Sequence, residues 1–212
     1  MAKIENLFES GRGKLGNLVF YKVGNNGYVR TQAAHFRDRK SPAQLAQRQK
    51  LQLMSGFLKP FTKLIRITFS ADAMGRSPMR AALSYNMRQA LAGEYPGIYV
   101  DKSKVLLSHG PLPVPVTASV ASQPDGLHIT WENGAEAARL NSDDILVVMA
   151  LSADTRSVDF LFTGVRRSVG HYLWSPALQK NNSNQPDIWL AFRNRQETLM
   201  SNSLYVGNRD AG

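Results

Sequence analysis

Alternating prolines divide this chain into two parts with different residue patterns. Residues 110–115, Gly-Pro-Leu-Pro-Val-Pro, cannot lie inside a helix or in a central strand, because proline fixes φ and has no N–H to donate. Before this stretch apolar residues recur largely at helical spacing, and after it short apolar or alternating runs are separated by polar turns. We therefore predict a domain boundary here, with a basic hairpin-and-helix region over residues 1–110 and an all-β domain over residues 111–212.

The second part has the pattern of an antiparallel β-sandwich. Its apolar runs are short, and turn-rich segments such as 152–156 and 181–186 separate them, as expected where strands are joined by turns. The predicted strands are Leu127–Trp131, Ile145–Leu151, Val158–Phe162, Ile188–Phe192 and Leu204–Val206.

The first part opens with a predicted β-hairpin. Leu18–Tyr21 and Tyr28–Thr31 are β-prone runs, and Gly24–Gly27 between them contains Gly and Asn, which tolerate the positive φ of a tight turn. Successive side chains of each strand lie on opposite faces. Because a two-stranded hairpin is marginal in water, at least one face needs a packing partner.

A helix is predicted to follow the hairpin. Ser41–Gln44 places Ser at the N-cap, Pro at the first helical position and Gln at the third, which together satisfy free backbone donors. An apolar stripe continues to Phe61, but Pro60 disfavours helical geometry at Lys59, so we expect a kink or break there. The next apolar run, Leu64–Ile67, fits either a helix or a strand.

A second helix is predicted from the same start signal, Ser77-Pro78. Leu83, Met87 and Leu91 follow at four-residue spacing, and Gly93 is expected to end the helix because glycine tolerates the left-handed cap. With the hairpin and the predicted sandwich, these helices make the expected fold class α+β.

The charge is concentrated in the N-terminal half. Residues 1–95 carry 16 Lys and Arg against 5 Asp and Glu, whereas residues 96–212 carry 10 against 11. This asymmetry points to a basic binding region joined to a near-neutral globular part. The absence of Cys excludes disulfides and thiol catalysis. The sequence has neither a long apolar run nor a secretory leader, so we expect a cytoplasmic or assembly-associated protein with no membrane insertion.

No motif predicts catalysis, a cofactor or a metal. Residues 11–16 satisfy G-x-G-x-x-G, but a dinucleotide-binding loop follows a strand and opens a helix, and this one precedes a hairpin. The four His residues are scattered, and Asp143-Asp144 fits a polar turn before a strand. We therefore expect a protein that is not an enzyme and has no cofactor, catalytic residue or metal site.

The candidate binding residues are basic and are interleaved with aromatic residues in the N-terminal half. Cationic side chains neutralise phosphates, and exposed aromatic rings stack on unpaired bases. The alternative is a solvated basic face above aromatic residues that are buried as core. The candidate electrostatic contacts are Arg30, Arg37, Arg39, Lys40, Arg48 and Lys50.

Several segments resemble a family of uncharacterised proteins common in Bacteroidetes and their mobile elements. The resemblance rests on Gly13–Tyr21, Tyr28–Arg30, Ser41–Arg48, Lys104–Leu112 and Ser201–Gly207, and so covers nearly the whole chain. Ser41 replaces the threonine usual in that family and keeps the capping chemistry. The C-terminal part also resembles a fibronectin type III or immunoglobulin-like sandwich, with Trp131 at the place of an early core tryptophan. Neither resemblance implies an activity.

Two functions remain open from the sequence. The first is a non-enzymatic structural or interaction protein, for example a component of a phage-like assembly, which binds a protein partner or itself. The second is a sequence-independent nucleic-acid-binding protein that contacts DNA or RNA through its basic N-terminal region.

Overall fold

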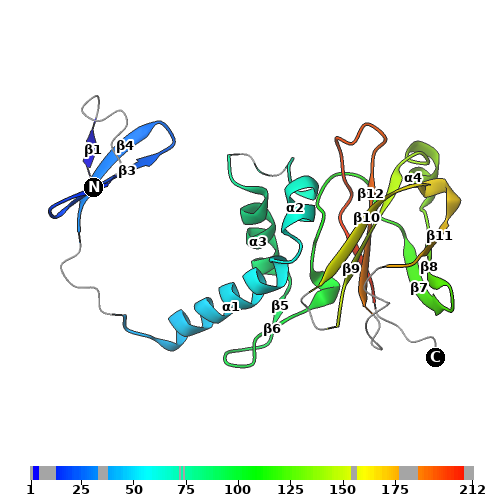
Figure 1. Ribbon diagram of the computed structural model, residues 1–212, viewed down its shortest axis with the longest axis horizontal. Coiled ribbons are helices and arrows are strands. Elements are labelled where there is room, and N and C mark those ends of the chain that lie inside the picture. Colours follow the sequence, from blue (N-terminus) through cyan, green and yellow to red (C-terminus); the bar gives the residue numbers. More distant parts are fainter. Residues whose placement is uncertain are drawn as a thin grey trace. The chain divides into compact units, whose positions relative to one another are not determined.

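The computed structural model describes residues 2–4 (backbone), 13–32, 38–71, 73, 75–153, 157–176 and 186–207. The chain forms two compact units, Met1–Ser41 and Pro42–Gly212. The structure contains both helices and antiparallel sheets, so the fold is α+β as predicted (Figure 1).

The smaller unit is a four-stranded antiparallel sheet in the order β1-β4-β3-β2. The predicted hairpin is confirmed: β3 (Leu18–Val23) and β4 (Asn26–Thr31) are joined by a two-residue turn in which Gly24 has φ +60°. The glycine-rich lead-in adds β2 (Gly13–Leu15) to one edge, and β1 (Ala2–Ile4) pairs with β4 at the other.

The larger unit begins with two helices that meet at the predicted break. α1 (Pro42–Leu58) starts at the expected Ser-Pro signal and ends before Lys59-Pro60. The ambiguous run Leu64–Ile67 is helical and lies within α2 (Thr62–Thr68), where Leu64 and Ile65 are buried. A backbone hydrogen bond spans the short link between the two helices, in which the N–H of Phe61 donates to the carbonyl of Leu58.

The third helix starts where the sequence predicts but ends earlier. In α3 (Pro78–Gln89) the Ser77 hydroxyl accepts the backbone N–H of Arg80 at 3.3 Å. The predicted end at Gly93 is wrong, because β5 (Leu91–Ala92) pairs with β6 (Tyr99–Val100). Gly93 lies instead in the turn between them at φ +80°, where a Cβ atom would lie 2.5 Å from the carbonyl oxygen of Gly97.

Two antiparallel sheets form the rest of the larger unit. One has the order β10-β9-β12-β13 and the other β11-β8-β7. All five predicted strands are present, whereas β7 and β11 were not predicted. The strands are β7 (Thr117–Gln123), β8 (Gly126–Glu132), β9 (Ile145–Leu151), β10 (Val158–Arg166), β11 (His171–Trp174), β12 (Asp187–Arg193) and β13 (Leu204–Gly207). The short helix η1 (Lys102–Lys104) precedes β7, α4 (Ala135–Leu140) connects β8 to β9, and η2 (Arg167–Val169) connects β10 to β11.

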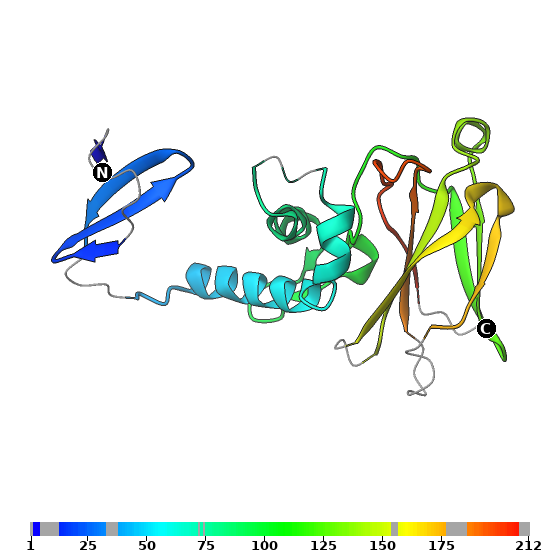
Figure 2. The same cartoon turned by 45° about the horizontal axis from the view of Figure 1, so that its top comes forward.

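In the larger unit, the sheet β10-β9-β12-β13 lies between the helices α1–α3 and the three-stranded sheet (Figure 2). Alternate residues of β9 face opposite ways, as the pleat requires: Met149 belongs to the core shared with the helices, and Val148 to the core shared with β8. The helix-side core therefore contains residues from both sides of the 110/111 boundary, for example Leu58 and Trp189. That boundary stays a prediction.

Two polar clusters, centred on the buried residues Asp187 and Arg167, tie distant segments of the larger unit together. Asp187 accepts hydrogen bonds from the Lys102 ammonium group at 2.6 Å and from the Tyr205 hydroxyl at 2.7 Å. The guanidinium group of Arg167 is completely buried and pairs with Asp144 at 3.3 Å. Within the described part of the chain, no helix is long and apolar enough to cross a membrane.

Candidate binding surface on the N-terminal sheet

The strand register sorts the side chains of the smaller unit onto two different faces. Residues directly opposite each other in an antiparallel pair share a face. Lys14 pairs with Val19, which pairs with Arg30, and Tyr21 pairs with Tyr28 in the adjacent row. The two tyrosine rings stack with their centroids 5.6 Å apart. We call Lys14, Val19, Tyr21, Tyr28 and Arg30 the basic face.

The opposite face is mainly apolar. Leu15 pairs with Leu18, and Phe20 pairs with Val29, so these four side chains share a face, which we call the apolar face. Leu15 is 70% exposed and Leu18 40% exposed. Exposed aliphatic side chains that are contiguous on one face are typical of surfaces that bind another molecule.

The smaller unit and the larger unit differ in how far their side chains are buried. None of residues 13–32 and 38–41 is buried, although the flanking strands extend the predicted hairpin to four strands. The larger unit has two extensive cores. The described residues of the smaller unit thus pair as strands but form no packed interior. Covering its apolar side chains would therefore stabilise the sheet further.

The structure places the six candidate electrostatic residues in different settings. Arg30 is exposed on the basic face, and Arg39 and Lys40 are exposed in the connector, where the Lys40 N–H donates to Asp38 Oδ1 at 3.2 Å. Arg37 lies outside the described residues. Arg48 and Lys50 belong to α1 of the larger unit.

Arg48 and Lys50 do not share a face of α1. An α-helix turns by about 100° per residue, so their side chains point about 200° apart around the helix. Arg48 is exposed, whereas Lys50 is half-buried and lies one turn before the buried Met54. Lys14, in contrast, joins Arg30 on the basic face. The signal for this was the turn at Gly16-Asn17, which brings β2 back along β3.

The remaining sequence candidates have structural partners. Asp143 is exposed and pairs with Arg166 at 3.2 Å, while Asp144 is buried against Arg167. Gly13 begins β2 and Gly16 follows it, and β2 leads into another strand and not into a helix. His109 stacks on Phe69. Across the residues that the structure describes, no three His, Asp or Glu side chains form a group that could hold a metal ion.

These features define an α+β protein with a separate small sheet that exposes one basic and one apolar face. The chain belongs to a family of unknown function, DUF6266, whose model matches residues 10–207. The expectation of an uncharacterised family that covers nearly the whole chain is thereby confirmed. No curated protein and no solved structure matches the chain.

Proposed function

We propose that this is a non-enzymatic interaction protein of an assembly, in which the N-terminal sheet is the binding element and the larger unit carries it. The observation that supports this most directly is the sheet's lack of a packed interior among the described residues, combined with its apolar face. Complete burial of a leucine side chain contributes about 1.5–3 kcal/mol. A partner that covers Leu15 and Leu18 would therefore stabilise both the complex and the sheet.

The proposal is tested with serine substitutions on the apolar face. Leu15→Ser/Leu18→Ser removes its two most exposed leucines, and Val23→Ser is the matched control, because Val23 is 60% exposed but lies on the opposite side of β3. Sedimentation over a concentration series measures self-association, and chemical cross-linking in the host identifies partners. We expect the wild type and Val23→Ser to form the same complex and the double variant to lose it.

Two results would contradict this proposal. One is an unchanged complex in the double variant. The other is a wild-type protein that stays monomeric and cross-links to no defined partner. The tryptophan residues all lie in the larger unit, so their fluorescence shows whether that unit remains folded in each variant.

A second candidate function is sequence-independent binding of nucleic acid, which the basic face favours. Lys14 and Arg30 share that face with the stacked pair Tyr21 and Tyr28. Cations neutralise phosphates, and tyrosine rings offer a surface on which bases stack. We expect Lys14→Glu/Arg30→Glu to weaken binding of random-sequence DNA or RNA and to lower the salt slope of log K by about 2.

The control for nucleic-acid binding is charge reversal of two exposed cations in the larger unit, Lys63→Glu/Arg66→Glu. It changes the net charge of the protein by the same amount, so a non-specific charge effect would weaken binding equally. Equal weakening by both pairs, or binding without salt dependence, would remove the basic face from consideration.

We further propose that residues 117–207 form an immunoglobulin-like module of the fibronectin type III kind. Seven antiparallel strands divided into a three-stranded and a four-stranded sheet support this assignment, as does the core position of Trp131, which is 4% exposed on β8. The helices cover the outer face of the four-stranded sheet, which a free-standing sandwich exposes to water. Such modules often act as spacers, which agrees by analogy with a carrier role in a phage-like or other assembly.

A further inference from the structure

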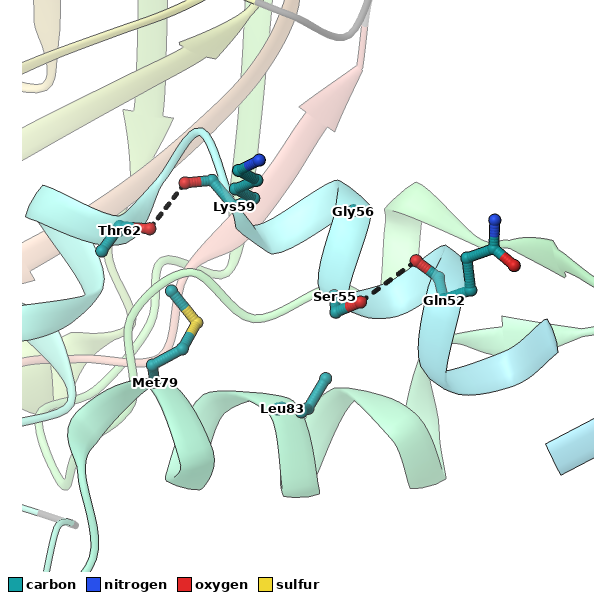
Figure 3. Close-up of a pocket in the computed structure, with 7 residues that line it drawn as sticks. All are labelled: Gln52, Ser55, Gly56, Lys59, Thr62, Met79 and Leu83. Atoms are coloured by element: carbon teal, nitrogen blue, oxygen red, sulfur yellow. Dashed lines mark hydrogen bonds between the residues drawn. The ribbon is translucent and has the colours of Figure 1, made fainter. Parts of the chain in front are cut away.

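A groove between α1 and α3 in the larger unit has an apolar lining and is open to solvent (Figure 3). Met79 and Leu83 of α3 point toward α1 across it. Two hydroxyl groups of the lining donate to backbone carbonyls, that of Ser55 to Gln52 at 3.2 Å and that of Thr62 to Lys59 at 2.6 Å. The groove encloses ≈ 480 Å³ and is lined by Gln52, Ser55, Gly56, Lys59, Thr62, Met79 and Leu83.

Gly56 in this groove has no role that the described residues explain. Glycine destabilises a helix relative to alanine, and the helix is hydrogen-bonded at this point, since the Lys59 N–H donates to the Ser55 carbonyl at 3.0 Å. A Cβ atom on Gly56 would meet nothing within 4 Å, and its φ is not in the left-handed range. Neither packing nor backbone geometry therefore requires glycine. The missing side chain leaves room for an outside group to reach the helix backbone.

The charged side chains of the three helices near the groove are all positive. The sequences of α1, α2 and α3 contain no Asp or Glu. Lys59, which lies just past the end of α1, lines the groove and supplies a positive charge there. Lys59 and Arg80 are exposed, and neither pairs with an acidic side chain among the residues that the structure describes.

We propose that this groove binds an amphipathic segment of an acidic partner protein, with one apolar side chain placed over Gly56 and a carboxylate beside Lys59. An amphipathic helix in a groove between two helices is a common mode of peptide recognition. The lining favours this occupant over nucleic acid, because it contains no aromatic ring on which a base could stack. The site lies wholly within the larger unit, so it is independent of the surface proposed on the N-terminal sheet.

The experiment selects ligands from a random-peptide display library on the purified full-length protein and measures the enriched peptides by calorimetry. We expect enriched sequences to combine Asp or Glu with Leu, Ile, Phe or Trp. Gly56→Leu fills the space and should weaken these peptides about tenfold or more. Gly164→Leu is the matched control, because Gly164 also has open space around it and an ordinary φ, but lies on β10.

A thermal melt of each variant shows whether it is still folded. Should Gly56→Leu unfold, Gly56→Ala serves in its place, with weaker peptide binding at unchanged or higher stability. Lys59→Glu should also weaken acidic peptides. The proposal is overturned by a selection that enriches no acidic peptide, by affinities that Gly56→Leu and Gly56→Ala leave unchanged, or by an oligothymidylate that binds the wild type but not the Gly56 variants.

Discussion

Replacing Arg167 by methionine should lower the free energy of unfolding by about 3–5 kcal/mol, because it leaves a buried carboxylate without its counter-charge. The Arg167 side chain is completely buried, and that of Asp144 is 7% exposed, so water cannot replace the lost contact. The same guanidinium group donates to the carbonyl of Pro113 at 2.7 Å and lies 3.8 Å from the centre of the Phe192 ring. Removing one side chain thus breaks several contacts at once.

A double-mutant cycle separates the buried charge from the lost packing. Asp144→Asn alone leaves the cation buried and should also destabilise the larger unit. In Arg167→Met/Asp144→Asn no charge remains, so the double variant should be more stable than Arg167→Met by about 1–3 kcal/mol, the usual cost of a buried unpaired polar group. Urea unfolding followed by tryptophan fluorescence gives each value, because Trp131 and Trp174 lie in the same core cluster.

The pH dependence gives an independent check on the same pair. Burial raises the pKa of Asp144, and Arg167 opposes that rise. Without Arg167 the folded-state pKa should rise further above the unfolded value of about 3.9. A raised pKa gives stability that is present below the unfolded pKa and is lost as pH rises through the folded pKa. Arg167→Met should therefore be closer to the wild type at pH 4 than at pH 7. A pH-independent difference, or a cost below about 1 kcal/mol, would refute the reasoning.

Three further predictions concern the larger unit, and urea titrations measure each. Gly56→Ala should raise the free energy of unfolding by about 0.5–1 kcal/mol, because the new methyl group has space and favours the helix; a loss would mean that the groove is closed in solution. Ser77→Ala should cost about 1 kcal/mol, because Arg80 loses its N-cap acceptor; no change would show that water replaces the cap. Burial raises the pKa of Tyr205, and its hydrogen bond to Asp187 acts in the same direction. The stability this gives is present below the ordinary tyrosine pKa of about 10 and is lost above it, so Tyr205→Phe should lose less stability above pH 10 than the wild type, and equal losses would contradict this.

The sequence predicts those parts of the fold that local chemistry determines. Ser41-Pro42 and Ser77-Pro78 mark helix starts because capping involves only neighbouring residues. The turn at Gly24-Asn25 and the apolar run Ile145–Leu151 are equally local signals. Strands without such signals were missed. β7, Thr-Ala-Ser-Val-Ala-Ser-Gln, has small and polar residues, and pairing with β8 makes it a strand.

Contacts between residues far apart in the sequence could not be predicted from it. Leu91 continues the four-residue spacing of α3, but it pairs with Val100, so the helix ends before it. The candidate site shows the same limit. Arg30 and Lys14 share a face only because β2 and β4 both pair with β3, and sixteen positions of sequence separate the two residues. Proximity along the chain suggested a single basic region, yet Arg48 and Lys50 lie on different sides of one helix.

Local rules that are broken without compensation among the residues that the structure describes point to where function lies, since natural sequences otherwise satisfy them. Leu15 and Leu18 are exposed on a sheet whose described residues have no packed interior, and Gly56 weakens a helix that has room for a side chain. Arg167 is the contrast: its buried charge is costly too, but Asp144, Pro113 and Phe192 compensate it within the same unit. These contacts give Arg167 a structural role. For Leu15, Leu18 and Gly56 the described residues supply no such compensation, and we propose that another molecule does; the two surfaces they define belong to different units, so variants of one should leave binding at the other unchanged.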